Sequence, residues 1–169
     1  DIKNYLSIKG VSLPISYSNI VLHFYDGGKF YFSDNTNGSI ALYTMDSTGQ
    51  YQKIANQAFF KLTKVKDVLY GINSSRQLYL SYDGGYAWTK STVEMHTFNL
   101  INIAGTAMYF RSNIIAELRL DGTVMNEIQY NAKGLEGNEI TWICKHNDRY
   151  YCTTKSGVYY IEERFFMPL

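Results

Sequence analysis

The chain has 169 residues, enough for one domain with a hydrophobic core, and its 16 Lys plus Arg against 15 Asp plus Glu leave a formal net charge of +1. This balance, with no run of basic residues, argues against a nucleic-acid-binding surface, and the apolar stretches are too short to span a bilayer. We therefore expect neither a nucleic-acid partner nor membrane insertion. Because the first residue is Asp1 and not Met, we expect a processed, excised or engineered segment.

Short apolar runs, each the length of a β-strand, follow one another along the chain. The composition of 16 Tyr and 9 Phe against 2 Pro favours strands, since aromatic residues suit a pleated surface. After a first run at residues 4–8, three groups of four runs follow, at 20–22, 30–32, 40–43 and 51–54, at 59–62, 69–71, 77–80 and 87–90, and at 100–103, 108–110, 116–120 and 124–128. A last group has three runs, at 140–143, 150–152 and 158–161.

The groups repeat with a period of about forty residues. Their first runs are anchored by Ile20, Phe60, Leu100 and Ile140, and Asp-Gly and Asn-Gly pairs of the kind that close hairpins lie between runs. Four antiparallel strands in about forty residues make one blade of a β-propeller. The sequence therefore predicts an all-β fold, a β-propeller of about four four-stranded antiparallel blades.

The predicted blades lie in a single domain, residues 1–169, near residues 18–56, 57–97, 98–137 and 138–169. The last group lacks a fourth run, and we expect residues 1–9 to pair with it and close the ring. Two alternatives stay open: the chain is part of a larger propeller, or the fold is an all-β sandwich with coincidental spacing.

One turn carries a complete motif, Ser-x-Asp-x-Gly-x-x-Trp, formed by Ser81, Asp83, Gly85 and Trp88. The Asp83 carboxylate can accept backbone N–H groups across the turn, Gly85 can adopt a left-handed conformation, and Trp88 can pack under the hairpin. Weaker versions of the motif surround Asp46 and Asp121. These features predict a structural role for the four residues.

The segment resembles the Asp-box, or bacterial neuraminidase repeat, of β-propellers found in sialidases, sortilin-type receptors and many non-enzymatic proteins. The resemblance implies that the motif lies on the turn between the third and fourth strands, away from any central pocket. Sialidase chemistry, as the resemblance would imply, needs an arginine cluster that binds a carboxylate, a Tyr–Glu nucleophile pair and an Asp that acts as acid and base. The chain has no Arg-Ile-Pro segment, and its arginines are Arg76, Arg111, Arg119, Arg149 and Arg164. We therefore expect a non-enzymatic member, with no catalytic residue.

No cofactor or metal site is expected. His23, His96 and His146 are not at ligand spacing, and Asp34 to Gly38 has the composition of a hairpin turn more than of a calcium loop. Cys144 and Cys152 are expected to face each other across a hairpin as two buried free thiols, with a cross-strand disulfide as the alternative.

These patterns predict a recognition or assembly module that binds a glycan, a cell-surface receptor or a partner protein, such as a viral or phage attachment or tail component. Propeller rims present loops on a rigid frame, and loops rich in Tyr and Asn suit adaptable contacts. The candidate binding rim consists of Tyr17, Asn35, Asn37, His96, Tyr130 and Asn131. The alternatives are a sialidase-like glycosidase, or a fragment of one, and a scaffold subunit of a larger assembly or oligomer. An extracellular or virion location would fit.

Overall fold

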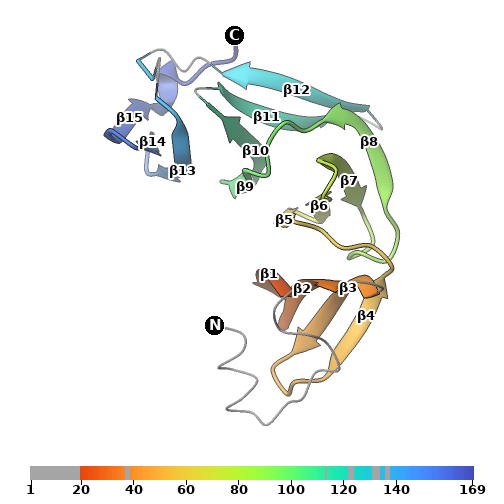
Figure 1. Ribbon diagram of the computed structural model, residues 1–169. Coiled ribbons are helices and arrows are strands. Elements are labelled where there is room, and N and C mark those ends of the chain that lie inside the picture. Colours follow the sequence, from red (N-terminus) through yellow and green to blue (C-terminus); the bar gives the residue numbers. More distant parts are fainter. Residues whose placement is uncertain (1–19, 37–38, 113, 122–123, 131–133, 136–137) are drawn as a thin grey trace. The chain divides into compact units, whose positions relative to one another are not determined.

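The computed structural model describes residues 20–36, 39–112, 114–121, 124–130, 134–135 and 138–169. The closing strand predicted at residues 1–9 lies outside these ranges. Antiparallel strands dominate the described residues and form four sheets in which each strand pairs with the next along the sequence (Figure 1). The chain divides into two compact units, Asp1–Lys90 and Ser91–Leu169, and the boundary falls within one strand.

The first unit contains the first sheet and most of the second. The first sheet has the order β1-β2-β3-β4, with β1 (Ile20–Asp26), β2 (Lys29–Thr36), β3 (Ser39–Asp46) and β4 (Tyr51–Ala55). The second has the order β5-β6-β7-β8, with β5 (Lys61–Val65), β6 (Val68–Ile72), β7 (Gln77–Ser81) and β8 (Thr89–Glu94). The core of this unit joins both sheets through Leu42, Ile54, Phe59, Leu62 and Leu69.

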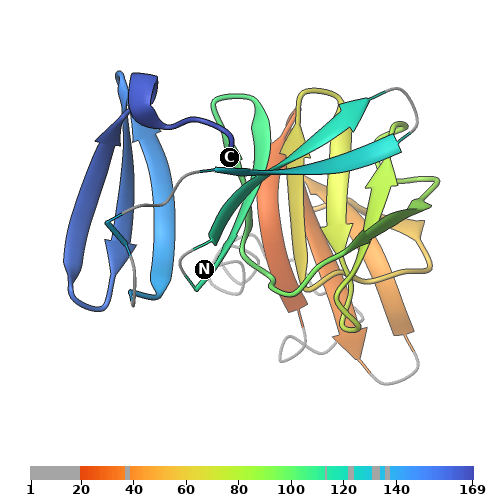
Figure 2. The ribbon, with the colours of Figure 1, turned by 90° about the horizontal axis from the view of Figure 1, so that it is seen from above.

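The second unit contains one four-stranded and one three-stranded sheet. The four-stranded sheet consists of β9 (Leu100–Ile103), β10 (Thr106–Arg111), β11 (Ile114–Asp121) and β12 (Val124–Tyr130). The other consists of β13 (Ile140–His146), β14 (Arg149–Thr154) and β15 (Gly157–Glu162), followed by the 3₁₀ helix η2 (Glu163–Phe165). In Figure 2 its strands, in blue, run side by side, with the short helix at one end.

The core of the second unit also joins its two sheets. It combines Ile101, Met108, Phe110 and Ile115 of the four-stranded sheet with Ile140, Ile143 and Cys152 of the three-stranded one, and it includes Phe166. Meanders of four short antiparallel strands that share cores between neighbouring sheets are the blades of a β-propeller. The all-β propeller class predicted from the forty-residue period is thus confirmed. Within the described residues, no helix is long and apolar enough to cross a membrane.

Two predicted strands are shifted along the sequence. The run at residues 59–62 was expected to start the second blade, but β5 begins at Lys61 because the fully buried Phe59 enters the core ahead of the strand. The run at residues 87–90 was expected to form the fourth strand, but β8 begins at Thr89 because Ala87 and Trp88 belong to the preceding turn.

The expected pairing of the two cysteines is wrong. In the hairpin of β13 and β14, Cys144 lies opposite Tyr151 and Cys152 lies opposite Ile143. This places the thiols on opposite faces of the sheet, since neighbouring residues of a strand point in opposite directions. Both cysteines are free, but only Cys152 is buried, and Cys144 is exposed. Burial, and to a smaller extent the charge of Cys144, raises the pKa of Cys152 to about 11.

Candidate functional site

The motif around Asp83 forms a closed network of hydrogen bonds on the turn between β7 and β8. Asp83 Oδ1 accepts the hydroxyl of Ser81 at 2.8 Å and the backbone N–H groups of Tyr86 and Ala87 at 3.0 and 2.9 Å. Ser81 Oγ in turn accepts the backbone N–H of Gly85 at 2.9 Å. The bonds from Ala87 and Ser81 are the main causes that lower the pKa of Asp83. All of these hydrogen bonds lie within the turn, so the Asp83 carboxylate stabilises its own hairpin.

Gly85 and Trp88 connect this turn to the core of the first unit. Gly85 is buried with a φ of +104°, and a Cβ atom there would lie 2.9 Å from Ile54 Cδ1. The indole N–H of Trp88 donates to the Gly85 carbonyl oxygen at 2.8 Å, and its ring lies 4.3 Å from that of Phe59, centroid to centroid. All four motif residues therefore hold a hairpin against the core.

The turn between β3 and β4 has a similar arrangement although its sequence has lost most of the motif. Asp46 Oδ1 accepts the backbone N–H groups of Thr48 and Gln50 at 2.9 and 3.0 Å and the Thr48 hydroxyl at 2.6 Å. The bond from the Thr48 hydroxyl is the main cause that lowers the pKa of Asp46. An aspartate thus organises the third-to-fourth strand turn of both of the first two sheets.

The predicted binding rim is only partly described. Tyr17, Asn37 and Asn131 lie outside the described residues. Asn35 pairs with Ile40 near the end of the hairpin of β2 and β3, whereas His96 lies exposed in the loop after β8. Tyr130 ends β12.

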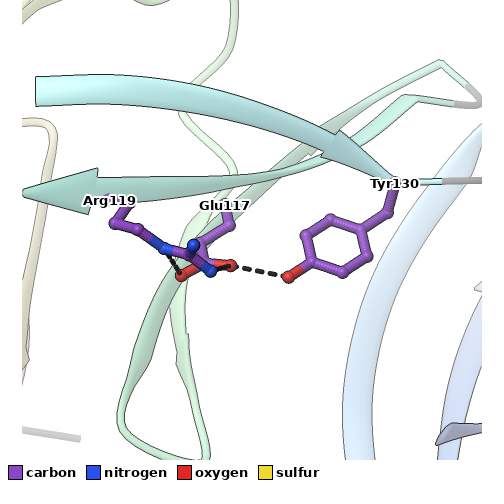
Figure 3. A network of polar contacts seen from close by, with 3 residues as sticks. All are labelled: Glu117, Arg119 and Tyr130. Atoms are coloured by element: carbon purple, nitrogen blue, oxygen red, sulfur yellow. Dashed lines mark hydrogen bonds and ion pairs between the residues drawn. The ribbon is translucent and has the colours of Figure 1, made fainter. Parts of the chain in front are cut away.

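Tyr130 belongs to a partly buried polar network in the second unit (Figure 3). Its hydroxyl donates to Glu117 Oε2 at 2.6 Å, and Arg119 donates to the same carboxylate from Nε at 3.1 Å and from Nη2 at 3.0 Å. Glu117 is only 8% exposed, which makes it one of the few buried charged residues described. The bidentate arginine and the tyrosine together satisfy a carboxylate that burial would otherwise penalise.

The electrostatics of this network favour a structural role. Burial would raise the pKa of Glu117, but the hydrogen bonds from Arg119 and Tyr130 outweigh it and lower the pKa below its ordinary value. Burial, followed by the hydrogen bond to Glu117, raises the pKa of Tyr130 to about 12. Burial likewise raises the pKa of Tyr109. A nucleophilic tyrosine would need its hydroxyl to lose a proton more easily, which is the opposite tendency.

The Tyr130 ring continues into a stack of three aromatic rings. Phe166 lies between Tyr130 and Tyr150, with centroid distances of 4.5 and 4.2 Å. Pro168 forms an isolated bridge with Tyr130, and the Leu169 N–H donates to the Gln129 carbonyl oxygen at 2.9 Å. Both ends of the Tyr130 side chain are therefore engaged within the second unit, which ties the C-terminal residues to the edge of β12.

Three arginines of the second unit have separate local partners. Arg119 binds Glu117, Arg164 Nε lies 2.8 Å from Glu162 Oε2, and the Arg149 guanidinium lies 4.7 Å from the centroid of the Tyr160 ring.

Within the described ranges, no group of three or more His, Cys, Asp or Glu side chains could hold a metal ion.

The three-stranded sheet buries one face and exposes the other. Ile143 and Cys152 are buried on the core side, where Tyr150, Tyr159 and Ile161 pack against them. The strand registers align nine residues on the other side, which we call the open face: Trp142, Thr153 and Val158, then Cys144, Tyr151 and Tyr160, then His146, Arg149 and Glu162. Trp142, Val158 and Tyr160 are 51%, 69% and 60% exposed.

One end of the open face borders a hollow of about 730 Å³. It is lined by the turn between β13 and β14 and by the end of β15: His146, Asn147, Asp148, Arg149, Tyr151, Glu162, Glu163 and Arg164. A hydrogen bond with Tyr151 and then the charge of Tyr160 raise the pKa of Arg149. Exposed aromatic residues beside mixed charges make this a candidate surface for a partner.

Sequence reasoning missed the open face and the Glu117 network. Glu117 was detectable as a carboxylate inside an apolar strand with Arg119 two residues later, a spacing that places both side chains on one face. The sequence placed Trp142 and Tyr160 in strands. It could not predict which face of their sheet is exposed, because that depends on how the sheets pack against each other.

Comparisons with known proteins identify the fold and no family. No family model matches the chain, and no curated protein matches it. A structure of YCF48 bound to D1 peptide aligns over 90% of this chain with a TM-score of 0.59 and 13% identity. This chain spans 52%, about half, of that structure's chain.

Two further structures align less well. One is a Saccharomyces cerevisiae assembly of Dbp5 with Nup159, Gle1, IP6 and ADP, with 11% identity over 78% of this chain and 37% of that chain, and a TM-score of 0.49. The other is the computationally designed protein Ika4, with 16% identity over 89% of this chain and 95% of that chain, and a TM-score of 0.47. At 13% identity, the similarity to the YCF48 structure concerns the fold alone.

Proposed function

We propose that the chain is a non-enzymatic recognition or assembly module that binds a protein partner through the open face of its last sheet. The observation that carries this is the exposure of Trp142, Val158 and Tyr160 on a sheet whose opposite face is core. Aromatic residues rimmed by charged ones are typical of protein interfaces. The peptide bound to YCF48, a propeller-type neighbour, supports a peptide-like ligand on such a fold.

The polar arrangements support binding more than catalysis. Glu117 and Tyr130 are hydrogen-bonded, as the Tyr–Glu pair of sialidase chemistry would be, but Arg119 donates to both oxygens of the same carboxylate and so holds it in an ion pair. Asp83 is engaged by its own turn. We retain glycan binding as a second candidate, because stacked aromatic and polar groups such as Tyr160 and Arg149 also suit sugars. A setting on a virion or cell surface stays a prediction.

The test compares the wild-type chain with a variant in which Trp142, Val158 and Tyr160 are all replaced by Ser. Both are presented to a display library of random heptapeptides and to a glycan array, and both are incubated with a panel of fluorogenic sialosides. We expect reproducible peptide hits that the variant loses, with no sialoside hydrolysis. Hits on the glycan array alone, or turnover of any sialoside, would contradict the proposal. Thermal melting must show that the variant is folded.

A further inference from the structure

The edge of β15 differs from the corresponding edge in every other described sheet. The third strands β3, β7 and β11 each have a fourth strand beside them, whereas β15 is the last strand of a three-stranded sheet. Residues of the other third strands are largely buried; Leu42, Leu78 and Ala116 are not exposed at all. Val158 and Tyr160 of β15 are mostly exposed.

The hydrogen-bond pattern shows which backbone groups of β15 face outward. Thr154 and Gly157 close the hairpin with β14, and beyond the other end of the ladder the Glu163 N–H donates to the Asp148 carbonyl oxygen at 2.8 Å. Bonded residues of an antiparallel pair alternate, so Tyr159 and Ile161 also face β14. The N–H and C=O groups of Val158, Tyr160 and Glu162 therefore point away from the sheet.

The residues that follow β15 do not cover this edge. After η2, the described tail runs to β12, where Pro168 bridges to Tyr130 and Leu169 donates to Gln129. A sheet edge of unpaired N–H and C=O groups is a template for another strand. The fourth strands of the other sheets, β4, β8 and β12, have 5, 6 and 7 residues, which gives the length of segment that fits.

We infer that β15 takes up an extended segment of a partner polypeptide as a fourth strand, of about five to seven residues, with an aromatic or apolar residue opposite Tyr160 and an acidic residue beside it. The aromatic preference follows from Val158 and Tyr160. The acidic preference follows from Arg149, whose guanidinium lies over the Tyr160 ring; it has a hydrogen bond with Tyr151 and shares the charge of Glu162 with Arg164, so an added carboxylate would balance the second cation. This inference rests on the proposed function and specifies its binding mode.

The test uses the heptapeptides selected from the display library, measured against the full wild-type chain. Each peptide is synthesised in two N-methylated forms, with methyl groups on alternate residues. Because only every second N–H of an added strand bonds to β15, one form should lose at least tenfold in affinity while the other stays within about threefold of the parent. Equal losses for both forms, or for neither, would overturn strand addition.

Amide hydrogen exchange supplies an internal control on the same samples. Saturating peptide should slow exchange of the Val158, Tyr160 and Glu162 amides at least tenfold and leave the Tyr159 and Ile161 amides unchanged. Tyr160→Pro, which removes an outward N–H, should weaken binding at least tenfold, and Tyr160→Ala, which keeps it, should weaken binding less. If Tyr160→Pro does not fold, the N-methyl comparison on the wild-type chain still decides.

The remaining outcomes separate this inference from the proposed function. If no peptide is selected, the proposed function fails and the inference fails with it. If peptides bind without the alternating pattern of affinity losses, only the inference fails.

A concentration-dependent dimer that shields the β15 amides would identify a second copy as the occupant of the β15 edge. If deletion of residues 1–9 raises the peptide affinity tenfold or more, that segment of the same chain is the occupant of the β15 edge. Either result overturns the inference of a partner strand.

Discussion

The indole N–H of Trp88 lies 2.8 Å from the Gly85 carbonyl oxygen, so one aromatic side chain both closes a turn and reaches the core beneath it. The same ring contacts Phe59, which enters the core before β5 begins. The motif therefore joins a surface turn to the packing between the two sheets of the first unit. The stability of that unit should depend on each component of the turn.

Asp83→Ala should lower the melting temperature by about 3 °C, because the backbone N–H groups of Tyr86 and Ala87 lose their acceptor. Differential scanning calorimetry measures the change. Affinity for the selected peptides should not change, because the turn lies in the other unit from β15. A loss of binding at an unchanged melting temperature would assign Asp83 to an interface.

Gly85→Ala should destabilise the chain by roughly 2–3 kcal/mol, since a Cβ atom would meet Ile54 at 2.9 Å and the residue has a positive φ. Gly84→Ala is the matched control. Gly84 has a φ of +77° but nothing within 4 Å of its Cβ position, so only backbone strain of about 1 kcal/mol is expected. Chemical denaturation measures both. Equal effects would show that steric contact with Ile54 is unimportant.

Glu117→Ala should cost about 2–3 kcal/mol, because it leaves the Tyr130 hydroxyl without its acceptor and removes the partner of Arg119. Tyr130→Phe, which keeps the stack on Phe166 and removes only the hydroxyl, should cost about 1 kcal/mol. Urea denaturation of both variants tests the order. A larger effect of Tyr130→Phe would contradict the central position of the carboxylate.

His23 should make the first unit sensitive to mild acid. Burial, followed by the Lys61 charge, lowers the pKa of His23 to about 3, and its Nε2 lies 2.8 Å from Ser33 Oγ. Below a pH of about 6.5 the unfolded chain binds a proton that the folded chain does not, so the free energy of unfolding should fall by up to ~1.4 kcal/mol per pH unit as the pH drops toward 3.

The comparison with His23→Gln isolates this effect from carboxylates that titrate at lower pH. Between pH 6.5 and 5 the wild-type chain should lose stability while the variant stays nearly constant, as followed by thermal melting across that range. Parallel curves for the two proteins would show that His23 does not govern the acid response.

Repeat spacing predicted the sheets well because every blade has to bury apolar residues at the same stage of its meander. Of the four anchors spaced forty residues apart, Ile20, Leu100 and Ile140 are the first residues of β1, β9 and β13, and Phe60 directly precedes β5. Register within a hairpin was harder to predict. A two-residue loop closes His146 against Arg149, which offsets Cys144 from Cys152 by one residue and turns one thiol outward.

The candidate surface depended on packing that no local pattern encodes. Tyr150 and Tyr160 are both tyrosines in strands of one sheet, yet Tyr150 packs on Phe166 and Tyr160 is exposed. Similarly, Tyr130 was expected on a binding rim as part of a loop rich in Tyr and Asn, and the structure shows its ring and hydroxyl engaged within the chain. Tertiary contacts, not residue type, decide between these roles.

The ring of Phe59 leaves no space above Gly71, where a Cβ atom would lie 2.5 Å from its edge. The two positions are therefore coupled by volume, because any side chain at position 71 requires a smaller one at position 59. In an evolving lineage they should change together or not at all. A covarying pair of this kind, glycine with phenylalanine or alanine with a small aliphatic residue, would let descendants of this blade be traced after its turn motif has disappeared.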